Sequence, residues 1–228
     1  MKKLIIFDLD NTFYDYEISH NFALMNVFDT QKVYLEYENF YKQYTLAKKQ
    51  VHLDLRGSPS IHSKLIYFKL LFHPILTYEK ILELEDIYWK AFIENSYIDI
   101  ESMNTLKKNK GKEDIYLLFT NQNLHIQLRK LNYWGLDFFD HILTSEEVGY
   151  EKPSQEFFDK ALDKFKAIED PSYELIAVGD SFENDINFWL TCFGAKGYLI
   201  NNKATDFKIE DGLHISNFQL AIDSIFKI

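Results

Sequence analysis

The sequence LIIFDLDNT, residues 4–12, places two aspartates one residue apart directly after an apolar run. Leu4–Phe7 has the length and composition of a short buried strand, and Asp8 and Asp10 follow it. Side chains alternate along a strand, so residues two apart leave it on the same face. Two carboxylates held close together repel each other unless a cation or a shared proton lies between them. The stretch therefore predicts a strand that ends in a metal site.

The composition predicts a folded protein of a reducing compartment. The 228 residues are 46% hydrophobic, which suffices for one large domain or a core with a smaller insert and excludes a disordered chain. The formal charge of −10, without a Lys/Arg-rich tract, argues against nucleic acid or a membrane surface as a partner. The single Cys192 permits no internal disulfide. We find no signal peptide and no run of about 20 apolar residues, so we expect a cytoplasmic protein.

The sequence pattern changes along the chain. Residues 17–94 are rich in aromatic side chains at helical spacing and predict three or four antiparallel helices, one with Pro59 in its first turn. Later, short continuous apolar runs alternate with amphipathic segments, which is typical of a parallel sheet buried on both faces. The expected strands are Leu4–Phe7, Ile115–Phe119, His141–Leu143, Leu175–Val178 and Tyr198–Ile200, and the clearest helices between them are residues 123–134 and 154–165.

These patterns predict an α/β fold in which the first strand joins the later sheet and residues 17–94 are an insert after it. In open α/β sheets the loop after a strand lies at the carboxyl edge, where ligands bind. An insert at this point is placed to act as a lid.

Polar residues follow the other expected strands at the same edge. Each of them could simply cap a helix or lie in solvent. Their order along the chain, each at a strand exit or a helix entry, favours one shared functional site instead. They are Thr120 and Asn121 after the second strand in the sequence, Lys152 before a later helix, and Asp180 and Asp185 after the fourth strand.

The four segments together resemble the motifs of the haloacid dehalogenase superfamily. Residues 8–12 resemble the first motif, Thr120 the second, residues 152–153 the third and residues 179–185 the fourth, so the resemblance spans nearly the whole chain. It implies a Rossmann-like three-layer core with a parallel sheet, formed by residues 1–16 and 95–228. Residues 17–94 are similar to the all-α helical cap of the subgroup that includes phosphoglycolate phosphatase, β-phosphoglucomutase and the dehalogenases.

The resemblance also implies a role for each residue in phosphoryl transfer through an aspartyl-phosphate. Asp8 would attack phosphorus as the nucleophile, and Asp10 would serve as the general acid and base. Mg²⁺ would bind Asp8, Asp180 and the main-chain carbonyl of Asp10, with Asp185 bound directly or through water. The residues expected to bind the phosphoryl group are Thr120, Asn121 and Lys152, of which Thr120 and Lys152 would also be catalytic.

Asp10 helps to distinguish between the reactions that members of this family catalyse. The dehalogenases use the same attacking aspartate on carbon, need no metal and lack an acid two residues on, so Asp10 favours a phosphatase of a small phosphorylated metabolite. A phosphomutase or phosphotransferase would use the same intermediate and stays open. The non-enzyme alternative is a receiver-like phospho-switch, whose phospho-accepting aspartate would end the strand where this chain has Thr120. Receivers also lack an insert of this size.

Substrate selection is expected to come from the cap, because the motifs handle only the phosphoryl group. Residues 52–64 bring Arg56, His62 and Lys64 close together in an otherwise acidic chain. Solvated surface side chains are the alternative interpretation. If the segment is functional, these side chains contact the leaving group when the lid closes.

Overall fold

A seven-stranded sheet forms the centre of the computed structural model, which describes residues 1–210 and 213–227. The strand order is β3-β2-β1-β4-β5-β7-β6, and every neighbouring pair is parallel except β6 and β7. The first strand is central, with β4 beside it, which confirms the predicted α/β fold. The strands are β1 (Lys2–Phe7), β2 (Ile115–Thr120), β3 (His141–Thr144), β4 (Tyr173–Gly179), β5 (Lys196–Ile200), β6 (Lys208–Glu210) and β7 (Leu213–Ser216).

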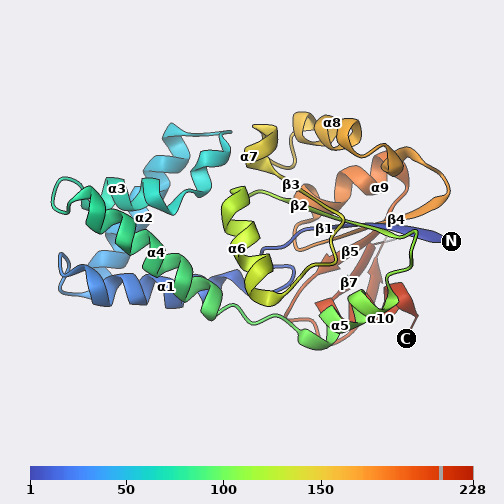
Figure 1. The fold of residues 1–228 in the computed structure, drawn as a ribbon, viewed down its shortest axis with the longest axis horizontal. Helices are drawn as coiled ribbons and strands as arrows, with labels where there is room; N and C mark the ends of the chain where they lie inside the picture. Colours follow the sequence, from blue (N-terminus) through green and yellow to red (C-terminus); the bar gives the residue numbers. More distant parts are fainter. Residues whose placement is uncertain (211–212, 228) are drawn as a thin grey trace.

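Helices cover both faces of this sheet (Figure 1). In β1, Ile5 and Phe7 point to one face and Leu4 and Ile6 to the other, and all four are buried. A strand buried on both faces needs a continuous apolar run, which is why Leu4–Phe7 lacks polar alternation. The first face packs on α5 (Ile100–Asn109), α6 (Leu124–Trp134) and α10 (Phe218–Phe226), and the second on α8 (Gln155–Lys164) and α9 (Asn187–Phe193).

The short elements of this part of the chain are α7 (Ser145–Val148), η2 (Lys166–Glu169) and η3 (Phe182–Ile186). Within the described ranges, no helix is both long and apolar enough to cross a bilayer.

The insert between β1 and α5 is helical and lies at one end of the molecule, drawn in blue to green in Figure 1. Its aromatic side chains are mostly buried in a cluster that continues onto the first face of the sheet. They therefore form core rather than surface. The division into a core and a cap of residues 17–94 stays a prediction. The elements of the insert are α1 (Tyr16–Gln31), α2 (Tyr37–Asp54), η1 (Pro59–His62), α3 (Lys64–Phe72) and α4 (Tyr78–Glu94).

The helix expected from Pro59 differs from prediction. Pro59 begins a single 3₁₀ turn, and the α-helix starts only at Lys64. The reason lies at Ser63, whose N–H closes the 3₁₀ turn on the carbonyl of Ser60 and whose extended backbone, with ψ of 108°, interrupts the helical path.

Candidate active site

Three carboxylates meet at the carboxyl edge of the sheet. Asp8 follows β1, while Asp180 and Asp185 follow β4, and oxygens of all three lie within 4.8 Å of one another. The register of the two strands produces this arrangement, because the pairing continues one residue beyond β1 with the N–H of Asp8 donating to the carbonyl of Val178 at 2.9 Å. The structure thus brings together the acids that the strand ends predicted.

Gly179 allows Asp185 to fold back against the end of β4. A Cβ atom at position 179 would overlap the Asp185 side chain, so a side chain here would displace the carboxylate. The turn is closed from both sides, since the N–H of Asp185 donates to the Ser181 carbonyl at 2.9 Å and the N–H of Ser181 donates to Asp185 Oδ2 at 3.0 Å. Asp185 is therefore held by its own turn before any ligand arrives.

Lys152 is the cation of this acidic group. Its side chain is 3% exposed, and Nζ lies 2.9 Å from Asp8 Oδ1 and 2.7 Å from Asp185 Oδ1. The Asn121 side chain fixes the main chain of Lys152, accepting from its N–H at 2.7 Å and donating to its carbonyl at 2.8 Å. Three carboxylates thus share one lysine, so the group carries excess negative charge.

The pKa values reflect this excess. Burial, reinforced by Asp185 and Asp180 and opposed by Lys152, raises the pKa of Asp8 to about 8. Burial and Asp185 likewise raise the pKa of Asp180 to about 6. A divalent cation would supply the missing positive charge, and a cluster of carboxylate oxygens is the donor set that Mg²⁺ prefers. The residues at this edge therefore fit a magnesium ion.

Asp10 lies apart from the acidic group and has its own lysine. Lys130, on α6, is fully buried and forms an ion pair with Asp10 Oδ1, while Gln127 Nε2 donates to Asp10 Oδ2 at 2.9 Å. The hydroxyl of Tyr14 donates to Asp10 as well. Burial alone would raise the pKa of Asp10, but the charge of Lys130 and these hydrogen bonds lower it. The side chains of the two aspartates of the first motif are therefore paired with different lysines, Asp8 with Lys152 and Asp10 with Lys130.

Lys130 and Gln127 connect Asp10 to its surroundings. The Lys130 ammonium lies 5.9 Å from the ring centre of Trp89 and 5.3 Å from that of Phe92, both on α4 of the insert. Gln127 Nε2 also donates to Thr120 Oγ1 at 2.6 Å, which leaves the Thr120 hydroxyl hydrogen free to point elsewhere. Asp10 is thus linked to the insert through Lys130 and to the end of β2 through Gln127.

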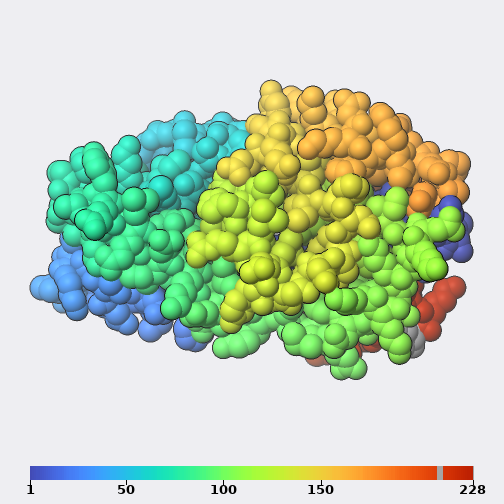
Figure 2. Space-filling view, viewed as in Figure 1, coloured from blue at the N-terminus to red at the C-terminus, as the bar shows by residue number. Residues whose placement is uncertain are grey.

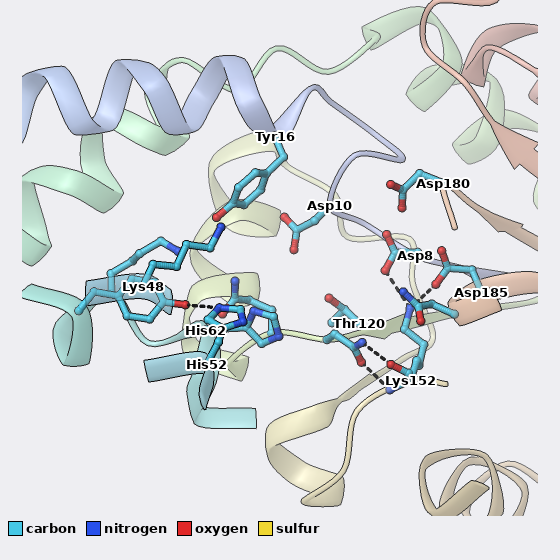
Figure 3. A pocket seen from close by; sticks show the side chains of 15 residues that line it. Asp8, Asp10, Tyr16, Lys48, His52, His62, Thr120, Lys152, Asp180 and Asp185 are labelled. Carbon is cyan, nitrogen blue, oxygen red and sulfur yellow. Dashed lines mark hydrogen bonds and ion pairs between the residues drawn. The ribbon is translucent and has the colours of Figure 1, made fainter. Parts of the chain in front are cut away.

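A cavity of about 310 Å³ separates this edge of the sheet from the insert (Figure 3). The insert contributes His62 and Lys64, as the sequence suggested, but Arg56 is exposed and does not line the cavity. The core residues on its wall include Asp8, Asp10, Thr120, Asn121, Lys152, Asp180 and Asp185, and those of the insert are Tyr16, Lys48, His52, His62, Lys64 and Tyr67.

The insert touches the core beside Lys152. His62 Nε2, in η1, lies 2.6 Å from Glu151 Oε1, and both side chains are mostly buried. Figure 2 shows the cyan segment around η1 against the yellow segment around α7. The cavity is therefore covered on this side by a contact between the two segments.

The central parallel sheet, the acidic group at its carboxyl edge and the helical insert beside it define an enzyme of the Rossmann-like α/β class. A family model for haloacid dehalogenase-like hydrolases matches residues 2–188. The chain belongs to this family of hydrolases.

Several known proteins are similar to this chain over most of its length. A protein of Halopiger xanaduensis named ribulose-1,5-bisphosphate 5-phosphatase is 30% identical over 193 residues, covering 82% of this chain and 80% of the relative. The magnesium-bound crystal structure of the putative hydrolase YfnB of Bacillus subtilis aligns with a TM-score of 0.65 at 20% identity, over 100% of this chain and 99% of that one. A 2-haloacid dehalogenase of Pseudomonas syringae aligns with a TM-score of 0.67 at 20% identity, over the same shares. The two structures share the fold with this chain.

Proposed function

We propose that this chain is a Mg²⁺-dependent phosphatase that hydrolyses a small phosphorylated metabolite through an aspartyl-phosphate on Asp8. The observation that carries the proposal is that Asp8 lies beside Asp180, Asp185 and Lys152 on the wall of the cavity. The phosphatase name of the 30% identical relative supports it. A cytoplasmic location and a small-molecule partner belong to the same proposal.

Asp8 is the proposed nucleophile of the first step. One of its oxygens forms a bond to phosphorus while the bond from phosphorus to the leaving oxygen breaks, and Asp10 gives that oxygen a proton. Lys152 contacts Asp8 and faces the same cavity, so its charge opposes the repulsion between the carboxylate and the phosphate. The arriving phosphate anion favours the neutral form of Asp10, against the effect of Lys130.

Asp10 is the proposed base of the second step. Water attacks phosphorus and loses a proton to Asp10, and the bond between phosphorus and Asp8 breaks to release phosphate. The lowered pKa of Asp10 keeps its carboxylate ionised before this step, ready to accept the proton. Lys130, Tyr14 and Gln127 hold the side chain in place for both transfers.

Asp8, Asp180 and Asp185 are the residues that would hold Mg²⁺, together with the main-chain carbonyl of Asp10. When bound, the ion would neutralise charge on the phosphoryl oxygens. The Thr120 hydroxyl is proposed to donate to the phosphoryl group, because its oxygen already accepts from Gln127. The Asn121 side chain is occupied with the main chain of Lys152, so its contribution is to position that lysine.

The test is hydrolysis of para-nitrophenyl phosphate by the purified protein. We expect activity with Mg²⁺, loss of activity with EDTA, and inhibition by Ca²⁺, whose looser coordination can occupy both oxygens of Asp8. Equal rates with EDTA and with Mg²⁺ would overturn the metal assignment. A phosphomutase would give no net phosphate release from its physiological substrate, and a dehalogenase would release halide from a haloacid without a metal.

A further inference from the structure

The insert places a buried, unpaired ammonium group on the cavity wall. Lys64 is the first residue of α3 and is 4% exposed, and it lines the cavity. Its ammonium lies 4.9 Å from the ring centre of Tyr67, 5.6 Å from that of Tyr88 and 5.9 Å from that of Trp89. Among the described residues, no carboxylate pairs with it and no acceptor takes a hydrogen bond from it. The rings attract the cation but supply no counter-charge.

Other basic side chains surround Lys64. Lys48, His52 and His62 also line the cavity, opposite Asp8 and Asp180 in Figure 3. The part of the insert that the structure describes contributes no carboxylate to this wall. Burial, together with the charges of Lys48 and Lys130 and against the weaker opposite effect of Asp10, lowers the pKa of Lys64 to about 7. The wall of the insert therefore carries basic side chains, whereas the opposite wall carries several carboxylates and Lys152.

A structural role does not explain this arrangement. Burying an ammonium group without a counter-ion costs stability, and an apolar side chain of similar length would fill the same space among the rings at no such cost. Lys48 adds to the cost by repelling Lys64. An anion bound between the two lysines would remove both penalties.

We propose that Lys64 and Lys48 form a second anion subsite, and that the substrate is a phosphomonoester whose other end carries a further phosphate or carboxylate group. The inference rests on the proposed function, because it assigns the transferred phosphoryl group to the side of Asp8. The phosphoryl group then lies at the acidic wall and the second anion at the basic wall. A cavity of about 310 Å³ is at the small end of ligand sites and suits a short metabolite rather than a nucleotide.

Matched substrates test the subsite. Propanediol bisphosphate is compared with propyl phosphate, and phosphoglycolate with ethyl phosphate, by kcat/KM in the presence of Mg²⁺. We expect the wild-type protein to prefer at least one doubly anionic partner by about tenfold or more, the size of one good charge-assisted contact. A preference in the first pair indicates that the subsite binds a second phosphate group, and a preference in the second pair indicates that it binds a carboxylate. No preference in either pair would overturn the inference.

Substitutions assign the preference to the lysines. Lys64→Met and Lys48→Met should each lower the ratio of kcat/KM between doubly and singly anionic substrates by about tenfold. Lys49→Met is the matched control, because Lys49 is exposed on the same helix as Lys48 and does not line this cavity. It should leave the ratio unchanged. If Lys64→Met and Lys48→Met lower kcat/KM for both kinds of substrate in parallel, the lysines bind the transferred phosphoryl group and the inference is wrong.

Folding and binding are checked separately. Lys64→Met should melt no lower than the wild-type protein, since it removes an unpaired buried charge. The exposed Lys48 gives a second variant that does not depend on the core of the insert. Calorimetric titration of Asp8→Asn with phosphoglycolate should show binding that weakens when Lys48→Met is added. Hydrolysis of para-nitrophenyl phosphate without this preference would refute the subsite alone, whereas no hydrolysis of any phosphate ester would refute the proposed function.

Discussion

The two walls of the cavity differ in charge and in construction. The core wall carries Asp8, Asp180 and Asp185 after the ends of two neighbouring parallel strands, where main-chain hydrogen bonds hold Asp8 and Asp185. The insert wall carries Lys48 and Lys64 on helices whose positions depend on the packing of aromatic rings. Rigid strand ends suit a reaction that needs exact placement of a nucleophile, and a separate helical wall can vary in its contacts without disturbing them. The proposed function therefore assigns chemistry to the core wall and substrate recognition to the insert wall.

The two segments meet at Lys130. This lysine pairs with Asp10 of the core and packs against Trp89 and Phe92 of the insert. The position of the proposed general acid and base therefore depends on the insert as well as on the sheet.

The largest effect is expected at the core wall. Asp8→Asn should abolish turnover, because it removes the nucleophile. Asp10→Asn should lower kcat by about 10²–10⁴-fold, because it keeps the nucleophile and loses proton transfer. Steady-state rates with para-nitrophenyl phosphate and with an alkyl phosphate measure the difference. The loss in Asp10→Asn should be smaller for the nitrophenolate leaving group, which needs no proton. Equal losses for both leaving groups would argue against Asp10 as the acid.

Lys130→Met should lower kcat by about tenfold to a hundredfold, because Asp10 loses the charge that orients it. It should also raise the pKa of Asp10, since Lys130 is the main group that lowers it. Where breakdown of the aspartyl-phosphate limits kcat, the acidic limb of the pH–rate profile should then move to higher pH. Arg129→Met is the control, because Arg129 is on the same helix and also contacts α4, through Asp86 at 3.8 Å, but does not pair with Asp10. A lower kcat with an unshifted profile would mean that Lys130 only supports the packing of the insert.

Asp8→Asn should stabilise the metal-free protein at neutral and alkaline pH. Burial raises the pKa of Asp8 to about 8, whereas the unfolded chain releases this proton near its usual value of about 3.9. Between these values the folded state holds a proton that the unfolded state has lost, so stability falls as pH rises through this window. Asparagine has no such proton, and the gain should reach the order of a few kcal/mol by about pH 8.

Thermal melting in EDTA at about pH 5 and about pH 8 measures this effect. Added Mg²⁺ should raise the melting temperature of the wild-type protein and do much less for the variant. A variant that melts lower than the wild-type protein at the higher pH would show that the ion pair between Asp8 and Lys152 outweighs the cost of burial.

Much of the fold could be predicted from the sequence, because each of the five predicted strands is marked by an apolar run of consecutive residues. The five apolar runs are strands, and the polar residues beside them reach the same edge by the geometry of parallel sheets. The edge strands β6 and β7 were not predicted, because Lys208–Glu210 and Leu213–Ser216 are short and partly polar. The pairing of β7 with β5, and of β6 with β7, arises from tertiary contacts that a sequence window does not contain.

Most of the predicted cavity residues lie at strand exits, and the others are Lys152 before α8 and His62 and Lys64 in the segment of residues 52–64. Lys130 and Lys48 are lysines within helices, and their sequence neighbourhoods do not distinguish them from solvated lysines. Lys130 is buried because α4, some distance away in the sequence, packs its aromatic rings against it. Arg56 was predicted to contact the substrate because it is close to His62 in the sequence, and this prediction is wrong. Arg56 is exposed and does not line the cavity.

The smallest predicted effect concerns the contact between the walls. Glu151→Gln removes the carboxylate that contacts His62. This carboxylate competes with an anionic group of the substrate for the basic side chains of the insert wall. We expect the KM for phosphoglycolate to fall by about twofold, the scale of a partly exposed ion pair. Glu174→Gln serves as the control, because Glu174 is similarly half-buried and pairs with Lys196, away from the cavity. A higher KM in Glu151→Gln would mean that the contact mainly holds the insert against the core.

The most direct test of the central claim is to trap the phosphoryl group on the protein. Radiolabelled acetyl phosphate and Mg²⁺ are mixed with the enzyme, the reaction is quenched in acid, and label bound to the protein is counted and mapped by peptide. The proposed mechanism predicts alkali-labile label on the peptide that contains Asp8, more of it in Asp10→Asn where breakdown is slowed, and none in Asp8→Asn. Label that persists in Asp8→Asn, or an active enzyme that never carries label, would contradict a mechanism through Asp8.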